Sequence, residues 1–405
     1  MHIDKLLERE NFQEIFKITL EKFFLIQHNK KLNISWNIKN NKNNNFLVNS
    51  KLNIIFHEAT LSKNIFPYIF QFLIHKNKLR SFAQNSFFRI VISKYFRSLF
   101  SNSYISISPF EKEFKNYIFL GGNHSISLIL LDEGTSTQIL KYNYDPKFII
   151  PSIETRIQFP YLPIPKLYSY SVEDYWVKQQ WIKGIPINRI ANKKLVYQCI
   201  SSANKAMINL YEDTYIKEPV KKWFLRISNE IENSIIKLSD VYDEKFIYFL
   251  KSIIQLINDK FFTKEFFCKF IYTSITHGDY NGSNIIHSDN QIQFENNTFL
   301  IDWDYCKRRF IMYDFIVLKF NSRTINGLYK SINLFMNNKI KFNYSDNYLF
   351  RNFCDNYTKL EFVGLFLLED ISVRIFENDI PNLNNINNDL INYFIQLKRI
   401  IKVYG

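Results

Sequence analysis

Two polar motifs in the second half of the chain constrain its fold most strongly. The first is His277-Gly278-Asp279-Tyr280-Asn281-Gly282-Ser283-Asn284, in which an aspartate comes five residues before an asparagine. The second is Leu300-Ile301-Asp302-Trp303-Asp304, which places acids at the end of an apolar strand, with Asp302 eighteen residues after Asn284. Such a strand end beside the first loop predicts an oxygen-rich pocket, which suits Mg²⁺ and its accompanying phosphates and waters. Asp279 would then be placed to orient an incoming hydroxyl or accept its proton.

Both motifs resemble those of the aminoglycoside phosphotransferase and choline kinase family, a branch of the protein-kinase-like fold. The family's catalytic loop reads H-G-D-x-x-x-x-N, which the segment 277–284 matches. Its metal strand reads apolar-I-D-[WF]-[DE], which the segment 300–304 matches. The motifs of the resemblance cover about 115–320. From there to 405 only the helical pattern of the sequence supports it, and residues 1–110 lie outside it.

The resemblance assigns a role to four acidic or amide side chains. It implies that Asp279 is the catalytic base and that Asn284 and Asp302 hold Mg²⁺. It also implies that Asp314, which follows an aromatic residue, is a buried acid bracing the catalytic loop. The role of Asp304 stays open between a second metal contact and a helix or loop cap. His277 is expected to brace the loop backbone, and the alternative for Asp279 itself is a turn cap.

The segment 115–183 predicts a small, mostly β layer with one helix. Strands are expected at 117–120, 126–131, 138–142, 166–170 and 175–181, and a short helix at 152–159. Gly121-Gly122-Asn123-His124-Ser125 would join the first two strands. A hairpin turn with Gly134 at a positive φ would join the next pair. A kinase small lobe requires this order along the chain: a glycine turn, two strands and then a lysine on the third strand, which here is Lys141.

The same resemblance implies a nucleotide site in this layer. Lys141 would reach the α- and β-phosphates of ATP, and Glu154 on the short helix would hold it. Gly121 and Gly122 would approach the phosphates, although GGNHS departs from the G-x-G-x-x-G pattern. The alternatives are a surface role for Lys141 and a solvated Glu154. Adenine would meet the backbone of a hinge, with contacts expected at two positions: Gln180 and Ile182.

The positive charge of the chain is concentrated at its beginning. The net charge is +14, and residues 1–110 hold 16 Lys/Arg against 6 Asp/Glu. Residues 59–110 contain seven basic residues and no acidic one, and 87–100 predicts a helix with one basic flank. The polar segment 37–49 predicts a loop or hinge. Because Phe, Tyr, Ile, Lys and Asn are all overused, A/T-rich coding is an alternative source of this basic and aromatic character.

Several protein classes are excluded by composition. No run of 18 apolar residues predicts a spanning helix, and the first residues lack the apolar core of a secretion signal. The four cysteines form no CxxC pair, which argues against a zinc ribbon or a disulfide scaffold. A reducing, cytoplasmic location is the simplest expectation.

The expected fold is α+β, a two-lobed protein-kinase-like structure with an added N-terminal region. We expect a basic extension at 1–112, a small antiparallel β lobe at 113–183 and a helical lobe at 184–405. The extension should pack mainly against the kinase domain. Its alternative role is as a binder of nucleic acid or an anionic membrane surface, of which nucleic acid is the less expected partner.

The expected function is transfer of the ATP γ-phosphate, with Mg²⁺, to a hydroxyl of a small molecule or glycan. A basic surface favours a sugar or a lipid-linked saccharide over a polycation. Acceptor contacts are expected in the C-terminal helical segment that contains Glu369, Asp370 and Arg374. The alternatives are an aminoglycoside or choline/amino-alcohol kinase, and a catalytically inactive kinase-like binding protein.

Overall fold

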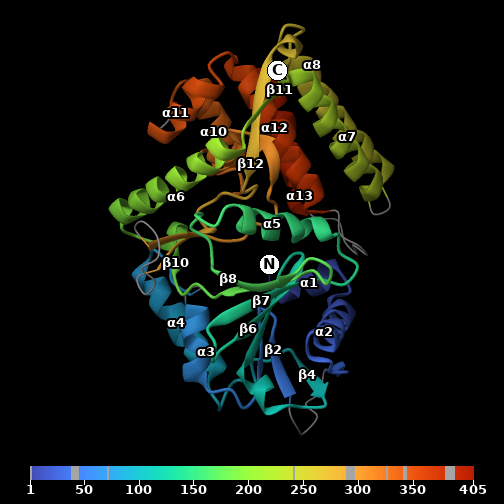
Figure 1. The fold of residues 1–405 in the computed structure, drawn as a ribbon, viewed down its shortest axis with the longest axis vertical. Coiled ribbons are helices and arrows are strands. Elements are labelled where there is room, and N and C mark those ends of the chain that lie inside the picture. Colours follow the sequence, from blue (N-terminus) through green and yellow to red (C-terminus); the bar gives the residue numbers. More distant parts are fainter. Residues whose placement is uncertain are drawn as a thin grey trace. The chain divides into compact units, whose positions relative to one another are not determined.

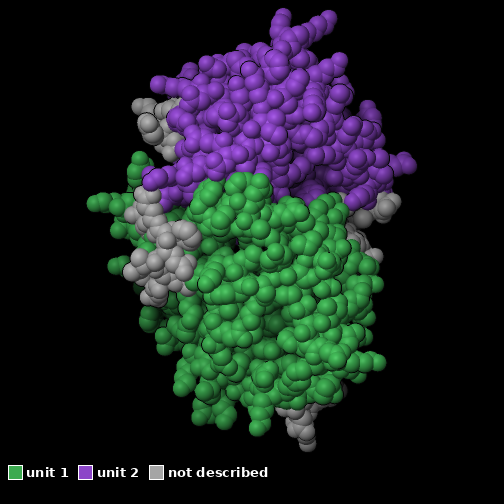
Figure 2. Space-filling model, viewed as in Figure 1, with its two compact units in different colours: residues 1–199, 285–301 green, residues 200–284, 302–405 purple. Residues whose placement is uncertain are grey.

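Three antiparallel sheets organise the strands of the residues that the structure describes. The structure is a computed structural model, and it describes residues 2–37, 45–70, 73–239, 242–288, 297–324, 327–340, 344–378 and 388–405. The chain divides into two compact units, coloured separately in Figure 2. Unit 1 comprises residues 1–199 and 285–301, and unit 2 comprises residues 200–284 and 302–405. Both units combine helices with antiparallel strands, which confirms the predicted α+β class.

Unit 1 is built on a nine-stranded sheet with the order β1-β4-β2-β3-β5-β6-β7-β9-β8. Its strands are β1 (Asn33–Asn37), β2 (Asn45–Asn49), β3 (Ile54–His57), β4 (Ser103–Ser108), β5 (Tyr117–Gly121), β6 (Ser125–Leu130), β7 (Thr135–Leu140), β8 (Leu167–Ser171) and β9 (Trp176–Gln180). Its helices are α1 (Ile3–Arg9), α2 (Phe12–His28), α3 (Ser62–Ile69), α4 (Lys78–Ile92) and α5 (Ile150–Gln158). Short 3₁₀ turns occur at Lys112–Asn116, Pro146–Phe148 and Ile187–Arg189.

Helices cover both faces of this sheet, α1 and α2 on one side and α3 and α4 on the other (Figure 1). Successive strand side chains point to opposite faces, so each strand supplies both layers. On β5, Phe119 joins the cluster under α1 and α2, whereas Ile118 joins the cluster under α3 and α4. Burial on both faces explains why β3 (IIFH) and β5 (YIFLG) are nearly continuous apolar runs.

Residues 1–112 were predicted to be an added extension that packs against the kinase domain. They instead supply four of the nine strands of this sheet, β1 to β4. Strand β3 pairs with β5, which joins the N-terminal strands to the predicted small lobe. The boundary expected at 112/113 does not separate two compact units. The predicted loop at 37–49 is wrong for 45–49, which form the buried strand β2, and its positions 38–44 lie outside the described residues. The predicted helix at 87–100 is α4, which ends at Ile92.

The expected elements of 115–183 are present with shifted ends. Strand β7 begins three residues earlier than predicted, and Lys141 directly follows it. Gly134 has φ +64°, as the predicted hairpin turn requires.

A second, three-stranded sheet joins β10 (Ile185–Pro186), β13 (Ile285–His287) and β14 (Thr298–Leu300). These strands belong to unit 1, so the helical unit does not begin at 184.

Unit 2 is mainly helical around a third sheet, with the order β11-β12-β15. Its strands are β11 (Ile216–Pro219), β12 (Phe270–Thr276) and β15 (Lys307–Phe310). Its helices are α6 (Lys193–Thr214, which begins in unit 1), α7 (Val220–Leu238), α8 (Glu244–Phe261), α9 (Tyr313–Phe320), α10 (Gly327–Met336), α11 (Tyr344–Phe353), α12 (Lys359–Phe376) and α13 (Asn388–Tyr404), with a 3₁₀ turn at Phe266–Cys268.

Helix α12 is the central helix of unit 2. A capping box begins it, with the Thr358 hydroxyl accepting from the Glu361 N–H and the Glu361 carboxylate accepting from the Thr358 N–H. Almost every residue of α12 is buried, and it packs against α7, α8, α9, α10, α13 and β15. No described helix is long and apolar enough to cross a membrane.

Candidate active site

The predicted catalytic loop lies in unit 2, directly after β12. The last residue of this strand, Thr276, pairs with Lys307, the first residue of β15. The segment 302–306 leads into β15, so the pairing of two strands brings the 277–284 loop and the acidic 302–304 segment to the same end of the sheet. The two motifs recognised in the sequence are thus neighbours in space because their strands are neighbours.

Asp314 braces the catalytic loop from the first turn of α9. Its side chain is fully buried. One carboxylate oxygen accepts from the His277 N–H (2.6 Å) and from the Tyr211 hydroxyl (2.8 Å), and the other accepts from the Gly278 N–H (2.9 Å). Charge-assisted bonds to consecutive backbone amides hold a loop firmly. The bracing role expected for Asp314 is confirmed by these contacts.

Gly278 and His277 determine the backbone conformation of the loop. Gly278 has φ +85°, and a Cβ atom there would lie 2.3 Å from the Tyr305 carbonyl oxygen. Only glycine fits this position. His277 is buried against Trp303, and its Nδ1 accepts from the Asp279 N–H (3.3 Å). The expected bracing role of His277 is therefore met by a bond within the loop.

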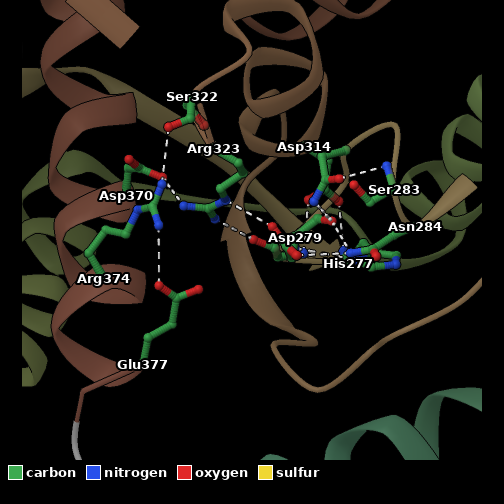
Figure 3. Close-up of polar contacts among 12 residues, drawn as sticks. His277, Asp279, Ser283, Asn284, Asp314, Ser322, Arg323, Asp370, Arg374 and Glu377 are labelled. Carbon is green, nitrogen blue, oxygen red and sulfur yellow. Dashed lines mark hydrogen bonds and ion pairs between the residues drawn. The ribbon is translucent and has the colours of Figure 1, made fainter. Parts of the chain in front are cut away.

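Each carboxylate oxygen of Asp279 has its own partner (Figure 3). The Asn284 side-chain amide donates to one oxygen (2.8 Å) and also to the Asp279 backbone carbonyl (2.9 Å). Arg323 Nε donates to the other oxygen (2.9 Å). The sequence brought Asp279 and Asn284 together correctly, but it gave no indication of Arg323.

Arg323 connects the catalytic loop to α12. Its guanidinium also donates to the Gly278 carbonyl (2.9 Å), to the Tyr313 hydroxyl (3.1 Å) and to Asp370 (3.0 Å). Asp370 is fully buried and accepts from the Tyr313 hydroxyl as well (3.0 Å). A planar guanidinium can make several directed bonds at once, so it fixes the position of the aspartate that it holds.

The charge of Asp279 depends on the same arginine. Burial acts to raise the pKa of Asp279, but the nearby Arg323 guanidinium, together with His277 and a hydrogen bond from Asn281, outweighs it. The pKa of Asp279 is therefore below its ordinary value. The carboxylate is ionised at neutral pH and is held in one orientation.

Asn284 and Asp302 have the oxygen chemistry that a hard cation needs. Because Asn284 uses its side-chain N–H groups on Asp279, its Oδ1 oxygen is the atom that can turn toward a cation. Asp302 is exposed and has φ +64°, a conformation that a non-glycine residue rarely adopts. No group of three or more His, Cys, Asp or Glu side chains is placed to hold a metal within the described ranges. Two protein ligands fit Mg²⁺, which keeps water and phosphate ligands besides.

Tyr305 is a buried tyrosine of the site whose pKa is affected by four carboxylates. Burial is the largest cause that raises the pKa of Tyr305 well above its usual value. The negative charges of Glu377, Asp279, Asp302 and Asp304 add to this effect. Two of these charges are offset, because Asp279 pairs with Arg323 and Glu377 pairs with Arg374.

The α12 residues that were expected to contact the acceptor have other partners in the structure. Glu369 is fully buried and accepts from the Trp223 indole (2.8 Å) and the Phe310 N–H (3.1 Å). Asp370 is equally buried and is used on Arg323, as described above. Arg374 donates to the Ser322 carbonyl (3.0 Å) and pairs with Glu377 (3.3 Å). Glu369 and Asp370 therefore stabilise unit 2 from inside and do not face an acceptor.

Lys141, in unit 1, is paired with an unexpected residue. Its side chain is fully enclosed, and its Nζ donates to Glu10 (2.5 Å) and to the Asn123 carbonyl (3.0 Å). Glu10 ends α1 and also contacts Arg9 and the Tyr144 hydroxyl. Burial lowers the pKa of Lys141 to about 7, against the opposing charge of Glu10. The enclosed ammonium has no surface for a phosphate in this arrangement.

The predicted pair of Lys141 with Glu154 is wrong because the two residues belong to opposite faces of the sheet. Lys141 follows Ile139 by two residues and enters the cluster under α1 and α2. Gln179 belongs to the other face, where it accepts from Arg156 of α5. Glu154 on the same helix is exposed.

Gly121 and Gly122 are explained by packing in unit 1. A Cβ atom on Gly121 would lie 2.6 Å from the Leu6 side chain of α1, and one on Gly122 would lie 2.7 Å from the Ser125 carbonyl. The Gly122 N–H donates to that carbonyl and closes the turn (3.0 Å). These contacts account for both glycines without a phosphate, whose binding here stays a prediction.

The hinge contacts expected at Gln180 and Ile182 also stay predictions. The Gln180 N–H is engaged by the Lys166 carbonyl (2.9 Å), so adenine could meet only its carbonyl. The Ile182 side chain is buried against Ile286 and Phe299.

Comparison with solved structures finds small-molecule kinases. Choline kinase LicA from Streptococcus pneumoniae is 10% identical, covers 73% of this chain and 92% of its own, and has a TM-score of 0.43. Plasmodium vivax ethanolamine kinase is 13% identical, with coverages of 71% and 82% and a TM-score of 0.41. A thermostable aminoglycoside phosphotransferase APH(4)-Ia is 12% identical, with coverages of 71% and 94% and a TM-score of 0.46.

These proteins belong to the group that the sequence motifs resemble. No protein-family model matches the chain, and no curated protein matches it in sequence. The site residues that sequence reasoning missed are Arg323 and Tyr305. Tyr305 lies beside the recognised acids, but Arg323 is 44 residues from Asp279 in a segment without any motif.

Proposed function

We propose that this chain is an ATP- and Mg²⁺-dependent phosphotransferase that acts on a hydroxyl of a small molecule or a glycan. The observation that carries the proposal is the state of Asp279: ionised, fixed by Asn284 and Arg323, and set in a loop braced by Asp314. In phosphoryl transfer the protein contributes mainly by positioning and by charge stabilisation.

Asp279 would act on the acceptor hydroxyl. An ionised carboxylate accepts a hydrogen bond from the hydroxyl and aligns its oxygen for attack on the γ-phosphate. Because the pKa of Asp279 is low, the group orients the hydroxyl through most of the step and takes the proton only as the oxygen loses its basicity. Arg323 would keep the carboxylate ionised and in place, as a positioning residue.

Asn284 Oδ1 and the Asp302 carboxylate would hold the metal. Mg²⁺ at that position neutralises charge on the phosphate oxygens. The left-handed backbone of Asp302 supports a functional reason for its placement, since such a conformation costs on the order of 1–3 kcal/mol at a non-glycine residue.

The proposed acceptor is a class of molecule defined by its hydroxyl groups. A sugar, free or carried on a lipid, has the hydroxyls that Asp279 could orient. An aminoglycoside, choline or another amino alcohol is the alternative. The bound nucleotide is proposed to be ATP.

A catalytically inactive, kinase-like binding protein is the second candidate. The enclosed Lys141–Glu10 pair favours it, because the lysine expected to meet the phosphates is occupied elsewhere. An inactive protein would bind nucleotide without turnover, whereas an enzyme would consume ATP when an acceptor is present.

The nucleotide site is tested by an Asp302→Ala variant. Calorimetry should show tighter ATP binding with Mg²⁺ than without it in the unaltered protein, and Asp302→Ala should lose this difference and all turnover. The exposed Asp355 of unit 2 provides a matched control, and Asp355→Ala should behave as the unaltered protein. Near-normal phosphoryl transfer by Asp302→Ala would contradict the proposal.

A further inference from the structure

Helix α4 has two apolar faces, and only one of them is covered. Phe88 and Ile92 are buried in the cluster that covers the sheet of unit 1. On the outer side of the same helix, Leu79 is 82% exposed and Phe82 is 72% exposed, with Ile90 also exposed. At 100° per residue these three positions fall within one narrow stripe, opposite the buried face.

The segment after α4 extends this apolar surface. Tyr95 is 88% exposed and Leu99 is 76% exposed, and Phe96 between them is exposed as well. We refer to the exposed large apolar side chains of this region as the α4 patch: Leu79, Phe82, Phe87, Ile90, Tyr95, Phe96 and Leu99. Phe87 of α4 contacts Phe100 in this following segment, and a concentration of exposed apolar side chains on a folded protein can mark a binding site.

Every charged residue in the segment that carries the α4 patch is basic. Five exposed basic side chains accompany it: Lys76, Lys78, Arg80, Arg89 and Lys94. On the helix, Arg80 lies on one side of the apolar stripe and Lys78 and Arg89 lie on the other. No acidic residue occurs anywhere in 59–110. The partner of this surface must therefore be both apolar and negatively charged.

We propose that the α4 patch binds the surface of an anionic lipid bilayer. A helix that presents large apolar side chains between two basic borders lies in the membrane interface, with its apolar face among the acyl chains and its cations among the headgroups. The aromatic side chains Phe82 and Tyr95 suit the depth of the headgroups. The absence of acids removes any repulsion from anionic lipids. The inference does not depend on the proposed phosphotransferase activity.

Two variants separate the electrostatic and the apolar contributions. The first is Lys76→Glu/Lys78→Glu/Arg80→Glu. It should leave α4 folded, because acidic residues are favourable in the first turn of a helix. The second is Leu79→Gln/Phe82→Gln, at positions so exposed that the core loses nothing. Both should keep the thermal unfolding of the unaltered protein.

The measurement is co-sedimentation of the full chain with vesicles of phosphatidylcholine, with and without phosphatidylglycerol. The unaltered protein should bind the anionic vesicles, and added salt should weaken the binding. The triple glutamate variant should lose at least about 100-fold in partitioning, since each basic residue near an anionic surface contributes about fivefold. The Leu79→Gln/Phe82→Gln variant should lose binding even at low salt.

Matched controls lie on α8 in unit 2. Lys245, Lys251 and Lys260 are exposed there, and their replacement by glutamate changes the net charge equally. That control should bind vesicles nearly as well as the unaltered protein. An equal loss in the control would show that net charge alone attracts the protein, which would overturn the proposal.

Two further results would also overturn the proposal. One is the absence of binding to anionic vesicles at low salt. The other is a dimer in solution that Leu79→Gln/Phe82→Gln converts to a monomer, because the α4 patch would then bind a second copy of the chain. Light scattering without vesicles distinguishes this case.

Discussion

Asp279 is ionised because of a residue that no sequence motif identifies. Burial of its carboxylate favours the neutral form, and Arg323, in direct contact, reverses this preference. The arginine is in turn held by Asp370 from α12. The motif thus provides the carboxylate that is proposed to act on the acceptor, and a distant part of unit 2 sets its charge.

Replacement of Arg323 by methionine should move the pH dependence of catalysis. Without the guanidinium, burial raises the pKa of Asp279, so the carboxylate becomes protonated at a higher pH and cannot accept the hydroxyl proton. The acid limb of the kcat/KM profile should shift to higher pH, kcat should fall, and KM for ATP should change little.

The conservative variant Arg323→Lys tests the same point without removing the charge. It should keep the acid limb close to that of the unaltered enzyme while kcat falls, since an ammonium cannot make the same set of directed bonds. The exposed Arg351 serves as a control through Arg351→Met. An unchanged acid limb in Arg323→Met would show that Arg323 does not set the charge of Asp279.

At the scale of elements, local motifs were predictable and distant pairings were not. The loop after β12 was identified from its own residues, and the brace Asp314 from the family resemblance that those residues carry. The partner of Lys141 was not, because Glu10 is 131 residues away and only the packing of α1 on the sheet brings it close. Glu154 is nearer in the chain, but it belongs to a helix on the other face.

The Lys141–Glu10 pair should make the attachment of α1 to the sheet depend on pH. In an unfolded chain a lysine has a pKa near 10.4, whereas burial in the fold lowers the pKa of Lys141 to about 7. Between these values the unfolded chain binds the extra proton, so the free energy of unfolding should rise as pH increases. The rise should be on the order of a few kcal/mol and should disappear in Lys141→Met.

This effect is measured by urea denaturation of the two proteins at several pH values. The quantity to compare is their difference in unfolding free energy, because other groups titrate equally in both. Lys178 of β9, which pairs with Glu133 and keeps contact with water, provides the control Lys178→Met. A difference between the unaltered protein and Lys141→Met that stays constant with pH would show that the buried amine does not titrate on unfolding.

For the whole molecule, the charge pattern correctly identified a basic N-terminal region, but the domain boundary predicted at its end was wrong. The first 110 residues are distinctly basic, yet their strands pair with those that follow, and β3 and β5 are adjacent in one sheet. Strand pairing depends on contacts between distant segments, which composition does not record. The α+β class was predictable because helical and strand periodicities are local.

The central claim is that unit 2 carries a phosphoryl-transfer site centred on Asp279. The most direct measurement is transfer of the γ-phosphate of ATP to a panel of sugars, amino alcohols and aminoglycosides, by the unaltered protein and by Asp279→Asn. We expect Mg²⁺-dependent transfer to at least one acceptor, and a kcat about 10²–10⁴-fold lower in Asp279→Asn with little change in KM for ATP. Transfer by Asp279→Asn at the unaltered rate, or nucleotide binding without transfer to any acceptor, would contradict the claim.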